Sequence, residues 1–200
     1  MRKIDDIAGL EALYGPASDA SLRKVAKRVT PMYRRWIEAS RFCVLSTVGA
    51  GGTDGTPRGD DGPVVEILDP GTLLMPDWRG NNRLDSLRNI VTDGRVSLMF
   101  MVPGDNIVVR VNGRAALTDD ADLRARFVQR NTRPTTVVVI EVDEIYAQCP
   151  KALLRSGLWG RDDSSGTPSL GDILAEMTEG EIDAQDWDKS YPERAAQTLW

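Results

Sequence analysis

The chain has 200 residues, 41% of them apolar, which is enough for one domain with a core of its own. Histidine is absent, which excludes Ser-His-Asp and Cys-His nucleophile pairs and any His-ligated zinc or haem. No apolar run approaches the roughly 20 residues of a membrane-spanning helix. The first residues also lack the apolar stretch of a secretory signal. We therefore expect a cytoplasmic protein with no metal site and no membrane contact.

Charge is distributed unevenly along the chain. Residues 161–200 hold ten acidic and three basic side chains, a net charge of −7, which leaves +2 on the other 160 residues. A body with so small a positive charge does not predict a nucleic-acid groove. Its arginines cluster locally instead, and this suits a small anionic ligand.

Three helices are predicted before the first strand. Residues 5–14 end at Gly15-Pro16, a second helix begins at Ser18 or Asp19 and ends near Val29, and Thr30-Pro31 opens a helix over 31–39. We interpret residues 1–40 as an N-terminal helical extension.

The middle of the chain reads as strands separated by short helices. Period-two or continuous apolar patterns predict strands at 41–48, 63–68, 72–76, 95–102, 107–117 and 136–149. A turn at 49–52 leads into a predicted loop over 54–62. Short helices are expected at 84–91, from Asp119 or Asp120 to Gln129, and from Pro150 to Ser156.

The fold class follows from these connections, which are too short for repeated right-handed crossovers between parallel strands. A mainly β domain with peripheral helices, an antiparallel barrel over residues 41–160, is the better interpretation. Residues 160–166 then read as a linker. The acidic tail, residues 161–200, holds a helix over 169–178 and another from Asp183 onward.

The segment Asp77–Ser86 joins a strand to a helix and is the richest in ligand-binding chemistry. Free backbone N–H groups at a helix start favour an anion, and Gly80 allows a ligand close to the backbone. Arg79 and Arg83 add forked cationic donors suited to phosphate. Asn81, Asn82 and Ser86 add neutral donors. An arginine-rich surface turn with Asn as a helix cap is the alternative.

Two further segments carry weaker signals. Arg58 and Gly59 follow the first strand, where an arginine beside a glycine can reach a phosphate, although by itself this pattern favours an exposed turn over a site. Lys151 and Arg155 are four residues apart and share one helix face with Ser156 nearby. The alternative for this helix is an exposed basic surface paired with the acidic tail.

The two cysteines, Cys43 and Cys149, lie in apolar or strand-like surroundings without metal-ligand spacing. We interpret both as inert core residues rather than as a disulfide.

Several motifs, in order, resemble pyridoxamine-5′-phosphate-oxidase-like proteins. The segments NRLDSLRNI (82–90) and RVSLMF (95–100) resemble the family's flavin loop, short helix and following strand. RFCVLST (41–47), PRGD (57–60) and RVNGRA (110–115) resemble barrel strands of the family. CPKALLRSGLW (149–159) and PSLGD (168–172) resemble the C-terminal part of one bacterial branch whose substrate is undefined.

The resemblance implies an antiparallel split β-barrel with FMN at the interface of a homodimer. Arg58, Arg79, Asn82, Arg83 and Ser86 fall where such proteins meet the flavin. Lys151, Arg155, Ser156 and Trp159 would reach the same pocket, from the partner chain. One departure matters. Family members that oxidise pyridoxamine phosphate end in an Arg- and Pro-containing segment that contacts the substrate together with a histidine, whereas this chain has no histidine and ends differently.

The function expected from the resemblance is that of an FMN-dependent oxidoreductase acting on a small molecule that the sequence does not identify. It implies no catalytic side chain, because the flavin itself carries the chemistry. The alternatives are a flavin or deazaflavin binding or storage protein without turnover, and the same fold with haem, which the missing histidine disfavours.

Overall fold

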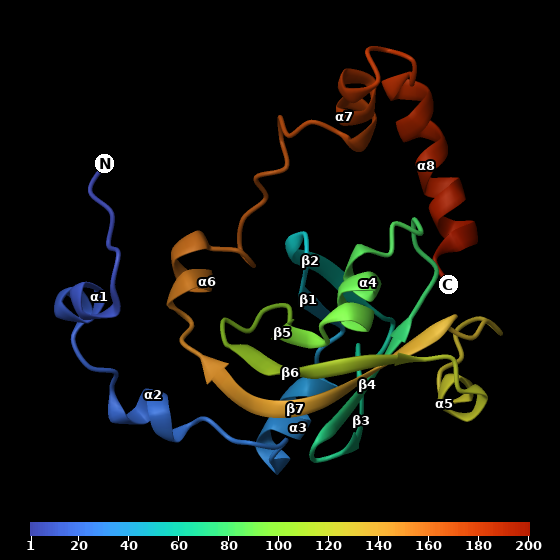
Figure 1. Ribbon diagram of the computed structural model, residues 1–200. Helices are drawn as coiled ribbons and strands as arrows, with labels where there is room; N and C mark the ends of the chain where they lie inside the picture. Colours follow the sequence, from blue (N-terminus) through green and yellow to red (C-terminus); the bar gives the residue numbers. More distant parts are fainter.

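The computed structural model describes residues 1–200 and contains one seven-stranded antiparallel sheet surrounded by helices (Figure 1). The sheet has the strand order β2-β1-β5-β6-β7-β4-β3 and is not closed, so β2 and β3 are its edges. The strands are β1 (Phe42–Gly49), β2 (Gly52–Gly59), β3 (Glu66–Asp69), β4 (Thr72–Asp77), β5 (Arg95–Met101), β6 (Val108–Thr118) and β7 (Thr136–Gln148). The predicted class, mainly β with peripheral helices in an open antiparallel barrel, is confirmed.

The helices fall into three groups along the chain. Before the sheet come α1 (Ile7–Tyr14), α2 (Asp19–Arg23) and α3 (Pro31–Glu38). Between strands of the sheet come α4 (Asp85–Thr92), after β4, and α5 (Ala121–Ala125), after β6. After the sheet come α6 (Lys151–Ser156), α7 (Leu170–Met177) and α8 (Ala184–Thr198).

The predicted loop over residues 54–62 is wrong, because residues 52–59 form strand β2. This strand pairs with β1 along its whole length, from Gly49 opposite Gly52 to Phe42 opposite Gly59. Its glycines and Pro57 are poor strand formers, which is why the pattern did not predict a strand. Proline is tolerated at an edge, where its missing N–H leaves no hydrogen bond unmade, and β2 is such an edge.

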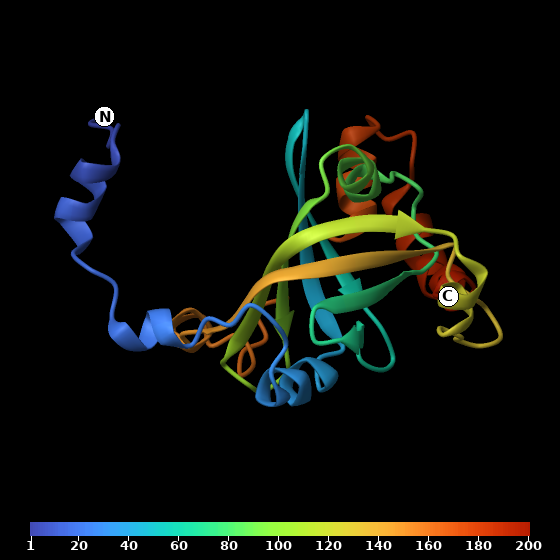
Figure 2. The same cartoon turned by 60° about the horizontal axis from the view of Figure 1, so that its bottom comes forward.

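The strands form a strongly curved sheet (Figure 2), and the core consists of apolar strand residues together with Ile37 of α3 and Ile90 of α4. Alternate residues of β1 point into it, with Cys43 and Leu45 fully buried. β6 and β7 are the longest strands, and the register between them shifts at Gly113. A Cβ at Gly113 would stand 1.9 Å from the carbonyl oxygen of Glu141, so only glycine allows this close approach.

Two helices are shorter than predicted because the following residues form isolated β-bridges instead. α2 ends at Arg23 rather than near Val29, since Ala26 forms an antiparallel bridge with Ile145 of β7. α5 ends at Ala125 rather than at Gln129, which bridges to Thr132.

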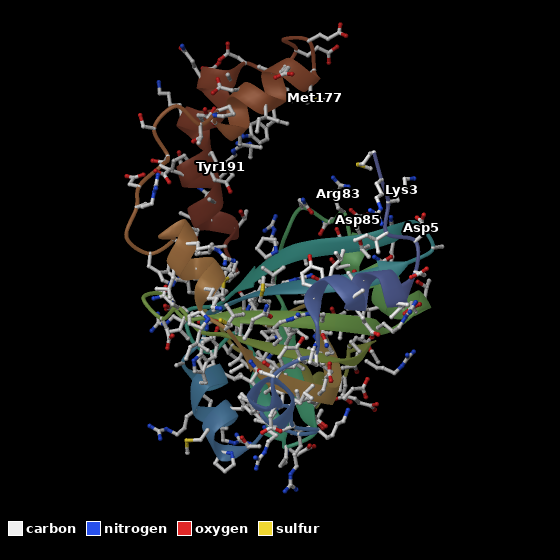
Figure 3. All side chains as sticks on the ribbon, turned by 90° about the vertical axis from the view of Figure 1, so that its left-hand side faces the viewer. Lys3, Asp5, Arg83, Asp85, Met177 and Tyr191 are labelled. Carbon is white, nitrogen blue, oxygen red and sulfur yellow. The ribbon has the colours of Figure 1, made fainter.

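The two ends of the chain lie outside the core. α1 and α2 bury no residue and extend away from the sheet (Figures 1 and 2). α7 and α8 pack on each other as a helical hairpin, on which Met177 and Tyr191 are exposed (Figure 3). No helix is long and apolar enough to cross a membrane.

Candidate functional site

A cavity of about 1510 Å³ lies between the β2 edge and the segment that joins β4 to α4. The start of β7 and the residues after α5 close another side, and Leu199 and Trp200 reach it from the end of α8. The cavity therefore collects residues from five separate parts of the sequence, which only the curled sheet brings together.

The inner face of β2 supplies the most deeply placed cation. Period-two alternation places Asp54, Thr56 and Arg58 on the partly buried face of β2, and the exposed residues between them also line the cavity at this edge. Arg58 Nη1 lies 2.5 Å from Asp77 Oδ1 at the end of β4, and the side chains are only 19% and 15% exposed. This ion pair joins the β2 edge of the sheet to the opposite half.

Two buried polar atoms in the cavity lining have no hydrogen-bond partner in the protein. They are Arg58 Nε and Thr136 Oγ1, and both residues line the cavity. A buried donor without an acceptor costs free energy, so such atoms indicate a place where a ligand or solvent supplies the partner.

Asp60 holds the far side of the β4–α4 segment in place. Its carboxylate accepts hydrogen bonds from Trp78 Nε1 at 2.7 Å and from Gln129 Nε2 at 2.8 Å. The indole of Trp78 is thereby fixed in orientation at the cavity wall. Because both carboxylate oxygens are engaged, Asp60 acts here as a positioning group.

The start of α4 faces the cavity without a side-chain cap. Its N-cap residue, Leu84, has the left-handed φ of 62°, and Asn82 two residues earlier has φ 59°. A left-handed leucine is strained, and strain of this kind concentrates at binding sites. The uncapped N–H groups and the helix dipole together favour an anion.

α4 is held against the β1–β2 hairpin by buried polar contacts. Ser86 Oγ donates to Asp54 on β2, and Asn89 Nδ2 donates to Thr47 Oγ1 on β1 at 3.0 Å. A Cβ at Gly49 would come within 2.0 Å of Asn89 Oδ1, so glycine permits this approach of helix to strand. The position of the helix start is therefore fixed by the sheet.

Five arginines and five aspartates line the cavity, and their pairing decides which cations are free. Arg58 pairs with Asp77. Arg83 Nε pairs with Asp85 Oδ2 at 2.9 Å, and this pair joins the loop before α4 to the first residue of the helix (Figure 3). The remaining three make no ion pair and no side-chain hydrogen bond: Arg79, Arg88 and Arg130. A ligand with several anionic oxygens would meet these unpaired guanidinium groups.

The structure brings most of the sequence-predicted site residues to this cavity. Its lining includes Arg58, Gly59, Arg79, Gly80, Asn81, Asn82, Arg83 and Ser86. A Cβ at Gly80 would meet no atom of the chain, so the space before it is open. Ser86 is buried and bonded to Asp54, so it supports the helix start rather than offering a free hydroxyl.

Lys151, Arg155 and Ser156 do not line the cavity of their own chain. They lie on α6, which follows the end of β7, whereas Thr136 in the cavity is the first residue of that strand. Trp159 also lies at the α6 end, where its Nε1 donates to the Asp105 carbonyl at 2.7 Å.

Several lining residues were not predicted from the sequence. Arg88, Arg130, Thr136 and Trp200 come from segments with no anion-binding pattern of their own. Trp78 lies inside the segment that was predicted to bind phosphate. Its aromatic ring, close in sequence to two arginines, was the one signal that could have identified it as a lining residue.

Cys43 is buried beside Arg58 but is not a candidate nucleophile. Burial raises the pKa of its thiol to about 12, and the nearby guanidinium charge only partly opposes this effect. Cys149 is exposed, so its interpretation as a core residue is wrong. Both thiols are free, and no cluster of metal-ligating side chains exists.

An open antiparallel sheet with an arginine-lined cavity at the start of an inner helix is the architecture of a split-barrel protein, and the cavity is its candidate site for an anionic ligand. The sequence pattern of the family described as pyridoxamine 5′-phosphate oxidase matches residues 29–149, which include all seven strands. The chain belongs to this family. A comparison with curated proteins finds no match.

Solved structures with a similar fold include HupZ from Group A Streptococcus, at 18% sequence identity and a TM-score of 0.50. The alignment covers 60% of this chain and 99% of that one. An FMN-binding protein from Syntrophomonas wolfei is 17% identical over 59% of this chain and 89% of its own, with a TM-score of 0.43. An FAD-binding protein from Mycobacterium smegmatis is 15% identical over 62% and 97%, also with a TM-score of 0.43.

Proposed function

We propose that this protein binds FMN in the arginine-lined cavity, with the phosphate at the start of α4. The observation that carries the proposal is the set of donors without a partner in this cavity: three unpaired arginines and an uncapped helix start. The unpartnered Arg58 Nε and Thr136 Oγ1 lie beside Asp77 and would meet another part of the same ligand. A phosphate bears close to two negative charges and strong acceptor oxygens, so it would satisfy several of these donors at once. Membership of the family supports the same ligand.

We propose further that the bound flavin makes the protein an oxidoreductase acting on a small molecule. FMN, when bound, supplies hydride or electron transfer. The protein's own groups bind and orient it: Arg79 and Arg83 by charge, and Asp54 and Asn89 by fixing α4. No protein nucleophile is required, which agrees with a chain that has no histidine. The same absence argues against pyridoxamine phosphate as the substrate.

A homodimer is the assembly that we propose for this site. The outer face of the sheet is apolar across three neighbouring strands, since Val44 lies opposite both Pro57 and Met99. Phe42 and Met101 extend the same face. Solvated sheet faces are normally polar, so this one suits a second copy of the chain. The partner would then bring α6, with Lys151, Arg155 and Ser156, toward the cavity that they do not reach in their own chain.

The test compares FMN with riboflavin, which lacks the phosphate, by flavin fluorescence titration. Arg79→Ala and Arg83→Ala each remove a cation from the cavity lining. A charge-assisted hydrogen bond contributes roughly 1.5–3 kcal/mol, so loss of one should weaken FMN about ten- to a hundredfold and riboflavin little. We expect the larger effect from Arg79, because Arg83 is already paired with Asp85.

Arg28→Ala is the matched control, because Arg28 is exposed, makes no ion pair and does not line the cavity. It should leave both affinities unchanged. If wild type, Arg79→Ala and Arg83→Ala bind FMN with the same affinity, the assignment of the phosphate to this end of the cavity is excluded. A wild-type protein that binds neither flavin would overturn the proposed function.

A further inference from the structure

The helical hairpin of α7 and α8 brings the last residue of the sequence to the cavity. The hairpin contributes no residue to the hydrophobic core. It is held together internally, for example by Gly171 N–H donating to Asp188 Oδ1 at 3.0 Å. Yet the chain after α8 returns to the body, so that Leu199 and Trp200 line the cavity (Figure 1). The hairpin thus acts as an arm whose end reaches the candidate site.

Trp200 contacts the aromatic ring that is fixed most firmly in the cavity wall. Its ring centroid lies 5.3 Å from that of Trp78, with an interplanar angle of 85°, an edge-to-face arrangement. Trp78 is itself held by its hydrogen bond to Asp60. Trp200 is half-buried, although Leu199 beside it is 53% exposed. The contact with Trp78 therefore buries the side chain of Trp200 more than that of its neighbour Leu199.

We propose that Trp200 and Trp78 together form the wall that receives the flat ring system of the flavin, so that the acidic tail is part of the binding site. This inference rests on the proposed function, and it names the residues that would bind the ring system of the same ligand, at the end opposite its phosphate. The two indoles offer an aromatic surface that suits a planar heterocycle. The carboxylates beside Trp78, Asp60 and Asp77, disfavour a phosphate at this end of the cavity.

The cavity has room for such a division. Its volume of about 1510 Å³ exceeds the roughly 300–1,000 Å³ of most small-molecule pockets. Unpaired arginines and the start of α4 serve the anionic end of the ligand, and the tryptophan pair serves the neutral aromatic end. No pattern in residues 161–200 pointed to this role, because a single tryptophan after an acidic helix carries no binding signature.

The test separates the two ends of the ligand with the same pair of flavins. Trp200→Leu removes the indole and retains an apolar side chain, while Trp200→Phe retains an aromatic ring. We expect Trp200→Leu to weaken FMN and riboflavin by the same factor, about three- to tenfold, because both contain the ring system. Fluorescence of the bound flavin should rise, since a neighbouring indole quenches it. Trp200→Phe should restore most of the affinity.

Tyr191→Leu is the matched control, because Tyr191 is an exposed aromatic residue of α8 that does not line the cavity (Figure 3). It should change neither affinity nor fluorescence. If the wild type binds flavin and Trp200→Leu binds it equally well, the inference is overturned and the proposed function stands. Tighter binding by Trp200→Leu would also overturn it, because Trp200 would then occupy the place of the ligand. Failure of the wild type to bind either flavin overturns both.

Discussion

The ion pair between Arg58 and Asp77 joins two distant parts of the sheet, and its removal should be costly. Arg58→Met deletes the guanidinium and leaves the Asp77 carboxylate, which is 15% exposed, without a cation. Losing one partner of a fully buried pair costs about 3–5 kcal/mol. Since both groups retain some contact with water, we expect a loss of about 2–3 kcal/mol in the free energy of unfolding.

The double variant Arg58→Met/Asp77→Leu distinguishes an unpaired charge from lost packing. Replacing both members of a buried pair by apolar residues is often neutral, so the double variant should lie within about 1 kcal/mol of wild type. Arg23→Met serves as the exposed control. Its pair with Asp19 joins side chains that are each 80% exposed, and its loss should cost less than about 0.5 kcal/mol.

Urea denaturation of the ligand-free protein, followed by far-UV circular dichroism, measures all four proteins under the same conditions. If Arg58→Met is as stable as Arg23→Met, the pair does not hold the β2 edge to β4 and the reasoning is refuted. If the double variant is no more stable than Arg58→Met, the cost arises from packing and not from the uncompensated carboxylate.

Two further predictions concern the thiols and the assembly. A disulfide-exchange reagent at pH 8 should modify one thiol of the native protein, because Cys149 is exposed and burial raises the pKa of Cys43 to about 12. Cys149→Ser should abolish this reaction, and rapid reaction of two thiols would contradict the prediction. Unfolding restores the pKa of Cys43 to about 9.0, so the contribution of this thiol to the free energy of unfolding is complete below pH 9 and is lost as the pH rises toward 12. This pH dependence of stability should diminish in Cys43→Ala. Light scattering of the flavin-loaded protein should give about twice the 22.0 kDa of one chain, and Met99→Glu on the apolar outer face should lower that mass; a 22.0 kDa species with flavin bound would exclude the dimer.

Strongly patterned elements were predictable from the sequence, and weakly patterned ones were not. β1, β5, β6 and β7 bury alternate or continuous apolar residues, so their periodicity was visible. β2 was not predictable, because its GTDGTPRG sequence reads as a loop and its pairing with β1 is a tertiary effect. The early end of α2 has the same origin, in a bridge from Ala26 to the distant Ile145, whereas α5 ends before a local bridge between Gln129 and Thr132.

The site was predictable only where its residues are adjacent in the sequence. Residues 79–86 carried glycine, asparagine and arginine before a helix, and the structure places them in the cavity. Arg88 and Arg130 gave no signal, since each is an ordinary polar residue in its own segment. The assignments of Lys151, Arg155 and Ser156, and the division into residues 1–40, 41–160 and 161–200, stay predictions.

The charge of the cavity shows why folded pairing matters more than composition for a site of this kind. Its five arginines and five aspartates cancel in number, and that balance alone would not predict a site for an anion. The fold, however, pairs three of the five aspartates with guanidinium groups: Asp77 with Arg58, Asp85 with Arg83, and Asp61 with Arg41, which lies outside the cavity lining. Asp54 and Asp60 accept hydrogen bonds from neutral donors and keep their charge. Arg79, Arg88 and Arg130 are exposed and have no carboxylate partner, so their guanidinium groups remain available to an anion. The aspartates therefore shape the site and hold its walls, and the arginines without partners are the groups that we propose bind the phosphate.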